Sequence, residues 1–324
     1  MRNVMVTGAN GFIGSALCQT LVDGGYLITA AMSAAEQKRC DARCAHAIVG
    51  DIDSATNWLR CLQSVDAIVH LAARIRIMDL SGAALLRAMR RTNVEGTESL
   101  ARQAAASGVK RFVYVSSIKV NGEQTSARPF TAGDQPSPQD AYAISKLEAE
   151  QALWRVALET GLEVVLIRPP MVYGPGVKGN FLRLIQWMDK GLPLPLASID
   201  NRRSQIALDN LIDFLALCIH HPAAAGQIFL ISDGQDLSTP ELLRRVACLL
   251  GRPARLWPVP PTLLRIAAQA TGKRAEFDRL GGSLQVDASY AREQLAWRPQ
   301  TSIDETLSRT IEWYRAQKSC PMNV

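Results

Sequence analysis

The chain has 324 residues, of which 48% are hydrophobic and 20% are charged. A chain of this length can bury a large core, and this composition is that of a globular protein rather than a disordered one. The formal net charge is +6, but lysines and arginines are scattered and aromatic residues make up only 6% of the chain. Because nucleic-acid binding calls for a basic stripe with stacking platforms, we expect no nucleic-acid partner.

The cysteines argue against a disulfide framework and a metal site, and the apolar runs argue against a membrane-spanning protein. Seven cysteines are scattered along the chain, which argues against a disulfide framework. Cys40, Cys44 and His46 lie close together, but no second ligand pair has suitable spacing, so no metal site is expected. No apolar run approaches the roughly 20 residues that span a bilayer, and a strand follows Met1 at once. We therefore predict a cytoplasmic protein with no membrane partner.

Short apolar runs alternate with longer stretches of helical periodicity in the first half of the chain. The predicted strands are 3–7, 27–32, 47–49, 67–70, 111–116 and 163–168. The predicted helices between them are 12–22, 82–106 and 141–160. This alternation predicts an α/β fold with a doubly wound parallel Rossmann sheet, whose ligand crevice lies at the carboxyl ends of the strands.

After Arg168 the pattern loosens, and proline and glycine interrupt it repeatedly. Apolar segments continue, which indicates a change of domain role rather than a flexible linker. We expect residues 1–168 to form the dinucleotide-binding domain, with parts of 203–232 returning to it. Residues 169–324 are expected to form mainly a smaller C-terminal α/β substrate-binding domain.

Helix boundaries in this second half are marked by capping patterns. Ser238 and Ser302 are each followed three residues later by glutamate, which predicts that each begins a helix. Gly251 is expected to end the first of these helices. An apolar helix over 261–271 is expected to act as a lid over the substrate rather than as a membrane anchor.

A glycine-rich turn follows the first predicted strand. Gly8, Gly11 and Gly14 are each separated by two residues, and the last two of them open the first predicted helix. Glycines at these points permit a tight turn and close approach of the backbone to a pyrophosphate, and the helix N-terminus attracts its charge. We expect this turn, together with Phe12 and Ile13, to bind a dinucleotide.

A serine, a tyrosine and a lysine supply the groups that carbonyl reduction or alcohol oxidation requires. Tyr142 and Lys146 are four residues apart on one face of a predicted helix, and Ser117 follows a predicted strand. A phenol pKa is about 10, so we expect nearby positive charge from Lys146 and a nicotinamide to lower it by ~2 to 3 units. Ser117 would hold the substrate oxygen while Tyr142 moves the proton. Each residue alone would also fit a surface helix pair or a strand-end cap.

The glycine turn and the Tyr-x-x-x-Lys motif resemble the extended short-chain dehydrogenase/reductases, also called the NAD-dependent epimerase/dehydratase family. The resemblance covers nearly the whole chain and adds three segments, 50–52, 70–73 and 168–174, together with Asn93. It implies a nicotinamide-dependent enzyme with catalytic Ser117, Tyr142 and Lys146. The cofactor contacts that it implies are Gly8, Gly11, Phe12, Ile13, Gly14, Ser33, Asp51, Ile52, Leu71, Ala72, Ala73, Asn93, Tyr142, Lys146, Pro169 and Val172.

Three further segments, 116–122, 173–181 and 232–236, resemble a bacterial subgroup labelled UDP-glucose 4-epimerase-like. That subgroup is similar to UDP-N-acetylquinovosamine dehydrogenases, which reduce 4-keto sugars for O-antigen and capsule assembly and so belong to lipopolysaccharide biosynthesis. The resemblance implies a nucleotide-sugar substrate. The substrate-binding residues that it implies are Ser117, Lys119, Asn180, Arg203 and Arg279.

The end of the second predicted strand bears on the choice of cofactor. An NAD-preferring fold usually places an acid there to bind the ribose hydroxyls, but residues 31–34 contain none. Lys38 and Arg39 follow, so a 2′-phosphate would meet no repulsion, and Glu36 is the nearest acid. We therefore favour NADP(H) over NAD(H).

The favoured reaction is hydride transfer at C4 of a UDP-(4-keto)-sugar, with 4-keto reduction ahead of 4-epimerisation. Dehydration is not expected, because Ser117-Ile118-Lys119 lacks the acid pair that the family's dehydratases carry. The alternatives are a steroid- or flavonoid-type alcohol dehydrogenase and an NAD(P)-binding regulator without turnover. The resemblance also implies a homodimer, because family members commonly pair the helix before the fifth strand with the helix that carries the tyrosine. Leu85, Leu86 and Met89 offer an apolar stripe for such a contact, although a stripe of this kind also fits the core.

Overall fold

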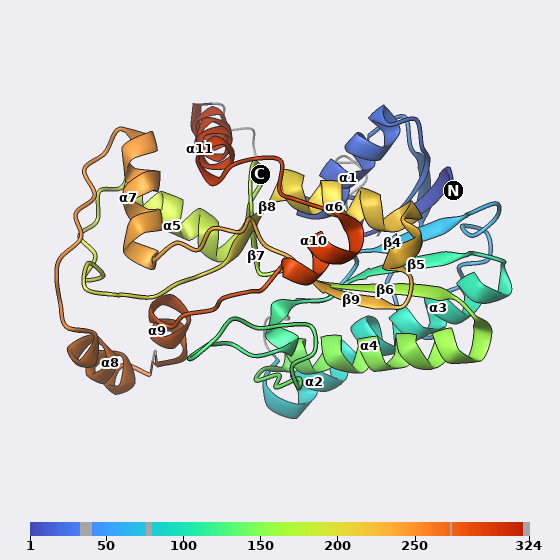
Figure 1. Ribbon diagram of the computed structural model, residues 1–324, viewed down its shortest axis with the longest axis horizontal. Helices are drawn as coiled ribbons and strands as arrows, with labels where there is room; N and C mark the ends of the chain where they lie inside the picture. The colour runs from blue at the N-terminus through green and yellow to red at the C-terminus, as the bar shows by residue number, and fades with distance from the viewer. Residues whose placement is uncertain (33–40, 76–79, 273, 320–324) are drawn as a thin grey trace.

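Seven parallel strands form one sheet in a computed structural model of the chain, which describes residues 1–32, 41–75, 80–272 and 274–319 (Figure 1). Their order is β3-β2-β1-β4-β5-β6-β9, which confirms the predicted Rossmann-type sheet. Every pair of neighbours is parallel. The strands are β1 (Asn3–Thr7), β2 (Leu27–Met32), β3 (Ala45–Ile48), β4 (Ala67–His70), β5 (Arg111–Val115), β6 (Glu163–Arg168) and β9 (Gln227–Leu230).

Helices cover both faces of the sheet, and each face has its own apolar core. Helices α1 (Phe12–Asp23) and α6 (Leu208–His220) lie on one face, and α3 (Gly96–Ala106) and α4 (Ala141–Thr160) lie on the other (Figure 1). Strand β1 shows why both faces are apolar. Val4 and Val6 belong to the first core and Met5 to the second, because successive side chains of a strand point to opposite faces.

The predicted helix over 82–106 is helical throughout, but its middle has π-helical rather than α-helical geometry, which the sequence did not predict. Helix α2 (Gly82–Arg90) runs into a π-helical turn (Arg91–Glu95), and α3 follows. A π turn carries an extra residue and rotates one helical face relative to the next. Here it lets α2, the turn and α3 all stay in contact with α4 while Asn93 is buried in the turn. Apolar periodicity does not reveal such a turn.

A second group of elements follows β6. Strands β7 (Met171–Tyr173) and β8 (Gln205–Ala207) form a parallel pair, and a third core packs around α5 (Gly179–Asp189), α7 (Thr239–Leu250) and α11 (Ile303–Ser319). The capping predictions are confirmed. Ser238 accepts a hydrogen bond from Glu241 N at 3.2 Å, Ser302 accepts one from Glu305 N at 3.3 Å, and Gly251 ends α7 with φ +67°. The third strand begins two residues earlier and ends one residue earlier than the predicted 47–49.

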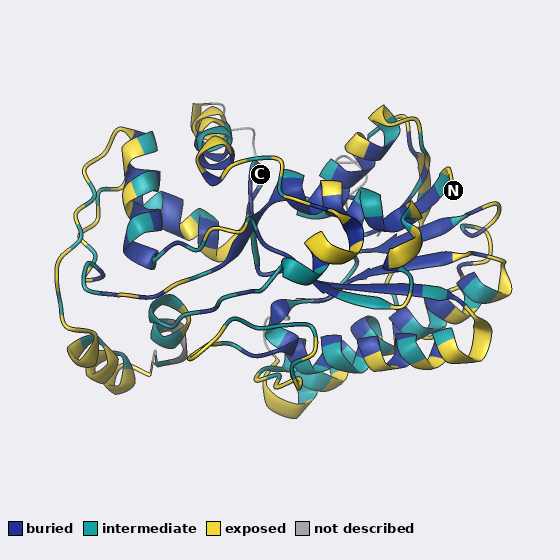
Figure 2. Ribbon diagram, viewed as in Figure 1, coloured by how far each residue is buried: buried dark blue, intermediate teal, exposed yellow. Residues whose placement is uncertain are grey.

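Three short α-helices lie between α7 and α11 in the described sequence: α8 (Pro261–Ala270), α9 (Arg274–Gly281) and α10 (Ser289–Leu295). Helix α8 contains no buried residue and is drawn almost wholly exposed (Figure 2). Within the part of the chain that the structure describes, no helix has the length and apolar character needed to cross a membrane.

Candidate active site

The glycine turn fits the backbone of a dinucleotide. Gly8 has φ +64°, and Gly11 N donates to Gly8 O at 2.9 Å. A Cβ at Gly14 would lie 2.2 Å from Gly8 O, so only glycine lets the first turn of α1 approach the strand end this closely. Phe12 and Ile13 follow in that first helical turn and pack against the core. The cradle and the helix N-terminus have the form that a pyrophosphate requires.

Thr7 joins the glycine turn to the loop that follows β4. Its hydroxyl oxygen accepts hydrogen bonds from Leu71 N and Ala72 N, both at 3.2 Å, and lies 2.7 Å from His70 Nδ1. His70 Nε2 lies 3.0 Å from the Thr97 hydroxyl. Burial, with the Lys146 charge added, lowers the pKa of His70 to about 3, so the ring is neutral at neutral pH. This buried network fixes the two loops predicted to bind the cofactor against each other.

Asn93 ties the same loop to α4. Its Nδ2 donates to Ser145 Oγ at 3.0 Å and to Arg74 O at 2.9 Å, and its Oδ1 accepts from Arg74 N at 2.7 Å. The side chain is only 1% exposed. Asn93 therefore connects the loop after β4 to α4, the helix that carries Tyr142 and Lys146.

Lys146 is held by two groups of β5, one of which sequence reasoning missed. Its Nζ donates to Val115 O at 2.7 Å and to the Tyr114 hydroxyl at 3.1 Å, and lies 4.2 Å from the centre of the Tyr114 ring. Burial lowers the pKa of Lys146 to about 7, against the opposing charge of Glu150. Burial also raises the pKa of Tyr114 well above its usual value. The signal for Tyr114 was its hydroxyl within the otherwise apolar run 112–115, three residues before Ser117.

Tyr142 lies in the first turn of α4, which Asp140 caps by accepting from Ala143 N at 2.8 Å. The Nζ of Lys146 is 6.0 Å from the centre of the Tyr142 ring. Burial raises the pKa of Tyr142, and the Asp140 charge raises it further. The polypeptide by itself therefore does not produce the lowered phenol pKa expected from the sequence, because Lys146 is directed to Tyr114 and Val115 instead.

Ser117 follows β5 at the same edge of the sheet. It is half-buried, and its hydroxyl accepts from Lys119 N at 3.3 Å. Lys119 Nζ donates to Asp140 Oδ2 at 2.6 Å, which brings the loop after Ser117 against the start of α4. Ser117, Tyr142 and Lys146 thus come from adjoining segments at the carboxyl edge of the sheet.

Two of the predicted substrate residues, Lys119 and Arg279, meet in a group of four charges that we call the rim cluster. Lys119 pairs with Asp140 and, at 3.0 Å, with Glu123. Arg279 reaches Glu123 at 3.2 Å and Asp140 at 3.9 Å. Burial disfavours the charge on Asp140, but the hydrogen bonds from Lys119 and Ala143 N outweigh it and hold the pKa of this carboxyl below its usual value. Sequence reasoning found the two cations and missed the two acids.

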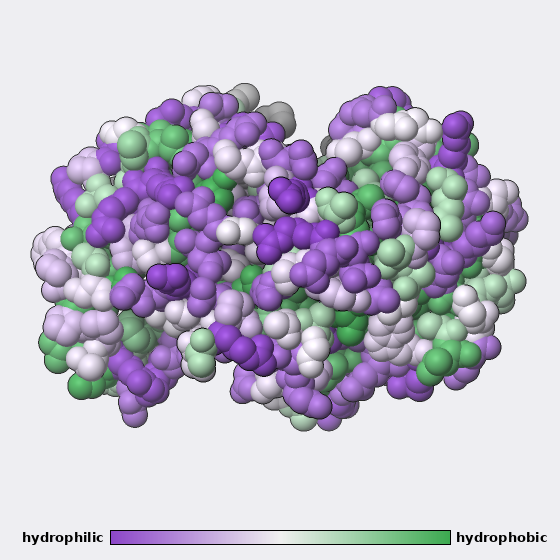
Figure 3. Space-filling view, viewed as in Figure 1, coloured by the Kyte–Doolittle hydropathy of each residue, from purple (hydrophilic) through white to green (hydrophobic). Residues whose placement is uncertain are grey.

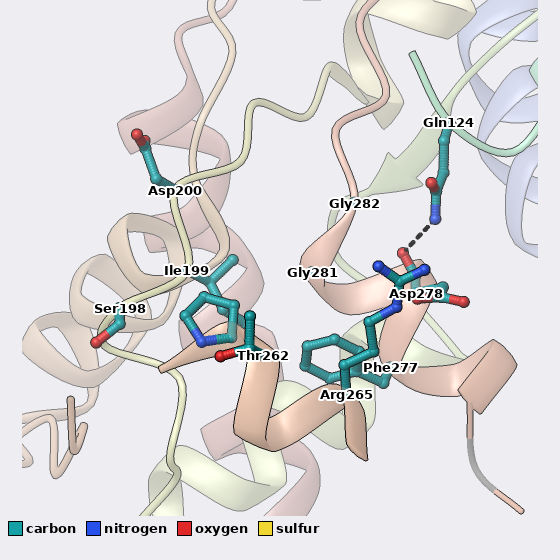
Figure 4. Close-up of a pocket in the computed structure, with 11 residues that line it drawn as sticks. Gln124, Ser198, Ile199, Asp200, Thr262, Arg265, Phe277, Asp278, Gly281 and Gly282 are labelled. Atoms are coloured by element: carbon teal, nitrogen blue, oxygen red, sulfur yellow. Dashed lines mark hydrogen bonds between the residues drawn. The ribbon is translucent and has the colours of Figure 1, made fainter. Parts of the chain in front are cut away.

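Figure 4 shows a cleft of about 410 Å³. Two of its lining residues, Gln124 and Asp278, are chain neighbours of Glu123 and Arg279 of the rim cluster. Gln124 forms one side and donates to Asp278 O at 3.0 Å, while α8 and α9 supply Arg265 and Phe277. The other lining residues are Ser198, Ile199, Asp200, Pro261, Thr262, Asp278, Gly281 and Gly282.

The other two predicted substrate residues differ in their relation to this cleft. Arg203 donates to the carbonyl of Gly282, a lining residue, at 2.7 Å. Burial lowers the pKa of Arg203, and Glu123 opposes the shift. Asn180 is exposed at the start of α5 and does not line the cleft.

The other predicted cofactor residues occupy varied positions. Asp51 is exposed and pairs with Arg74 at 3.3 Å, and Ile52 packs on the second core. Pro169 accepts from Ile118 N at 3.0 Å through its carbonyl. The remaining positions are Ala73 in the loop after β4 and Val172 in β7.

Some predictions fall on residues that the structure does not describe. Ser33, Glu36, Lys38, Arg39 and Cys40 lie outside the described residues. Among the residues that are described, no group of three histidine, cysteine or acidic side chains could hold a metal ion.

A dinucleotide cradle, a parallel sheet and a Ser-Tyr-Lys group at its carboxyl edge define a Rossmann-type enzyme of hydride transfer. Residues 4–232 match the model of the NAD dependent epimerase/dehydratase family, and the chain belongs to that family. It is an NAD-dependent enzyme of the extended short-chain dehydrogenase/reductase type.

Similar proteins include both epimerases and dehydratases. The chain is 42% identical to a UDP-glucose 4-epimerase of Vibrio cholerae over 96% of this chain and 95% of that protein. Among solved structures, DesIV of Streptomyces venezuelae, a dTDP-glucose 4,6-dehydratase with NAD and TYD bound, is 27% identical with a TM-score of 0.79 and 98% coverage of each chain. MoeE5 in complex with UDP-glucose and NAD is 26% identical with a TM-score of 0.77, covering 98% of this chain and 99% of that one.

Proposed function

We propose that the chain is an NAD-dependent UDP-sugar 4-epimerase. The observation that carries this proposal is the arrangement of Ser117, Tyr142 and Lys146 beside a dinucleotide cradle, in a chain 42% identical to a protein named UDP-glucose 4-epimerase. This reverses the order expected from the sequence, where 4-keto reduction came first. Reduction of a UDP-4-keto sugar stays the second candidate, since it needs the same side chains.

The cofactor would be held by the glycine turn, by the loop after β4 and by Lys146. Bound NAD would supply the hydride acceptor and a positive charge. The sequence favoured NADP(H), because residues 31–34 contain no acid. We propose NAD instead, since the similar MoeE5 and DesIV structures contain NAD.

The chain's own residues would manage the proton. Ser117 holds the sugar O4 by a hydrogen bond, and the phenol oxygen of Tyr142 takes the O4 proton and later returns it. Val115 O and the Tyr114 hydroxyl hold the Lys146 ammonium in place. Its Nζ is 6.0 Å from the centre of the Tyr142 ring. Because the pKa of Tyr142 is raised in the polypeptide, the proton transfer depends on positive charge that arrives with the cofactor.

The cleft supports a nucleotide sugar over a steroid or flavonoid alcohol. Arg265 lines it together with Asp200 and Asp278, and Arg203 donates to the carbonyl of the lining residue Gly282. Arg279 follows the lining residue Asp278 in the chain, so a diphosphate would meet cations as well as acids there. A regulator without turnover would have no need of Tyr142 and Lys146, and both are present.

We also propose the roles of the two parts. Residues 1–168, with α6 and β9, would bind the dinucleotide, and most of 169–324 would bind the sugar nucleotide. We propose a homodimer through α2 and α4. Of the predicted stripe, Leu85 and Leu86 are half-buried and could contribute to the interface, whereas Met89 is buried within the chain itself. We propose that the enzyme is cytoplasmic and supplies sugars for lipopolysaccharide.

Mass spectrometry of the small molecules released on denaturation tests the proposal. An epimerase must return the hydride to the same substrate, so NAD should be released in near-equal amount to protein. Release of NADP would overturn the choice of cofactor. Release of no dinucleotide, together with consumption of added NAD(P)H by a UDP-4-keto sugar, would favour the reductase.

A further inference from the structure

The outer surface of α8 and the segment before it is apolar and exposed. Trp257, Leu263 and Ile266 are 62%, 57% and 65% exposed, and we call these three side chains with Arg255 and Arg265 the α8 surface. Apolar atoms gather over α8 at the lower left of Figure 3, beside polar ones. A helix normally buries at least one apolar face against its own core, and α8 buries none.

The chain segment that forms this surface carries charges of one sign, whereas Asp200 and Asp278 line the cleft beside α8. Residues 242–275 contain seven lysines and arginines and no aspartate or glutamate. Acids from elsewhere neutralise some of these cations, since Arg245 pairs with Asp304 and Arg274 with Asp278. Arg255 and Arg265 are exposed, and neither forms an ion pair within the described residues. The α8 surface therefore combines exposed apolar side chains with unneutralised positive charge.

We propose that the α8 surface docks on a bilayer that contains anionic phospholipid. A short helix with an exposed apolar face and basic residues beside it can lie in the plane of a membrane interface, where tryptophan also prefers the headgroup level. Helix α8 carries Arg265, and Arg255 and Trp257 precede it. Arginines beside it are attracted by the negative surface potential of such a bilayer. A second copy of the chain fits less well, because a two-fold interface would place Arg255 and Arg265 against identical cations.

Docking would bring the cleft to the membrane. Pro261, Thr262 and Arg265 of α8 line the cleft as well, so the helix that contacts lipid also forms one wall of the site. The enzyme would then work at the bilayer surface without crossing it. This revises the sequence prediction of no membrane partner and gives α8 a role besides that of a lid.

Co-sedimentation with vesicles tests the proposal. The full chain should bind vesicles of phosphatidylcholine with about one third phosphatidylglycerol, bind phosphatidylcholine alone at least about tenfold more weakly, and be released by salt. The double variant Leu263→Ser/Ile266→Ser should lose at least about tenfold in binding, and Arg255→Gln/Arg265→Gln should lose the preference for anionic lipid. These side chains are exposed, so thermal unfolding should not change.

Leu158→Ser is the matched control, because Leu158 is 89% exposed on α4, away from α8. It should bind vesicles as the wild type does. Equal binding to both vesicle types, or wild-type binding by Leu263→Ser/Ile266→Ser, would overturn the proposal. A changed sedimentation coefficient in that variant without vesicle binding by the wild type would assign the surface to a second copy. A changed KM without vesicle binding would leave α8 a lid only.

Discussion

The carboxyl edge of the sheet and the rim of the cleft position polar groups in opposite ways. At the sheet edge, Asn93 and Lys146 are each 1% exposed and bond mainly to backbone carbonyls and neutral hydroxyls. At the rim, Lys119 and Arg279 are 30% and 44% exposed and pair with acids. Buried hydrogen bonds to carbonyls and hydroxyls fix the positions of side chains, whereas exposed ion pairs contribute little to the free energy of folding and exchange partners readily. In the proposed function, catalysis therefore uses buried side chains in fixed positions, and substrate binding uses exposed side chains that a charged ligand can rearrange.

Removing the phenol oxygen at the rigid edge should have the largest effect. We expect Tyr142→Phe to lower kcat by about 10³-fold, since a positioned proton donor contributes roughly 10² to 10⁴. NAD should stay bound. Tyr114→Phe is the matched control, because Lys146 keeps its bond to Val115 O, and kcat should fall by about tenfold or less. Equal losses in the two variants would remove the distinction between proton transfer and positioning.

Gly14→Ala should break the cofactor cradle. The added Cβ would lie 2.2 Å from Gly8 O, so α1 must shift, and we expect a loss of about 1–3 kcal/mol in the free energy of unfolding together with loss of bound dinucleotide. Gly133→Ala is the control, since nothing lies within 4 Å of its added Cβ. Urea unfolding and released NAD measure both effects. A Gly14→Ala protein with full NAD content would contradict the cradle.

The buried Lys146 should make the stability of the NAD-free chain depend on pH. Its folded pKa of about 7 lies below its usual value, so the unfolded chain binds more protons between these two values and stability rises with pH. Relative to Lys146→Met, the wild type should gain roughly 2 kcal/mol in the free energy of unfolding between pH 7 and 9. Parallel curves for the two proteins would show that Lys146 is not buried as described.

The smallest effect is expected at the rim. Glu123→Gln removes a carboxylate that pairs with both Lys119 and Arg279, so a diphosphate should bind more readily and the KM for a UDP-sugar should fall roughly threefold. Arg279→Gln should raise it by a similar factor. Steady-state kinetics separates the two. If neither variant changes KM, the rim cluster does not touch the substrate.

The two regions also differ in how far the sequence predicted them. The glycine turn and the Tyr-Lys pair were recognised because their partners lie within one turn or one helix. The π turn at Asn93 was not, because residues 90–99 contain one large apolar side chain, Val94, and their buried positions include Asn93 and Thr97, so hydrophobic periodicity gives no signal there. Tyr114 looked like one more core residue of β5. The acids of the rim cluster were missed because Glu123 and Arg279 are 156 residues apart and meet only in the folded chain.

The proposed reaction is tested most directly by NMR of UDP-glucose incubated with the chain as purified, with no nicotinamide added. We predict that the C4 epimer appears with its C4 proton retained in deuterated water, and that Tyr142→Phe forms none. Absence of conversion until NAD(P)H or a UDP-4-keto sugar is supplied would contradict the epimerase and leave a reductase.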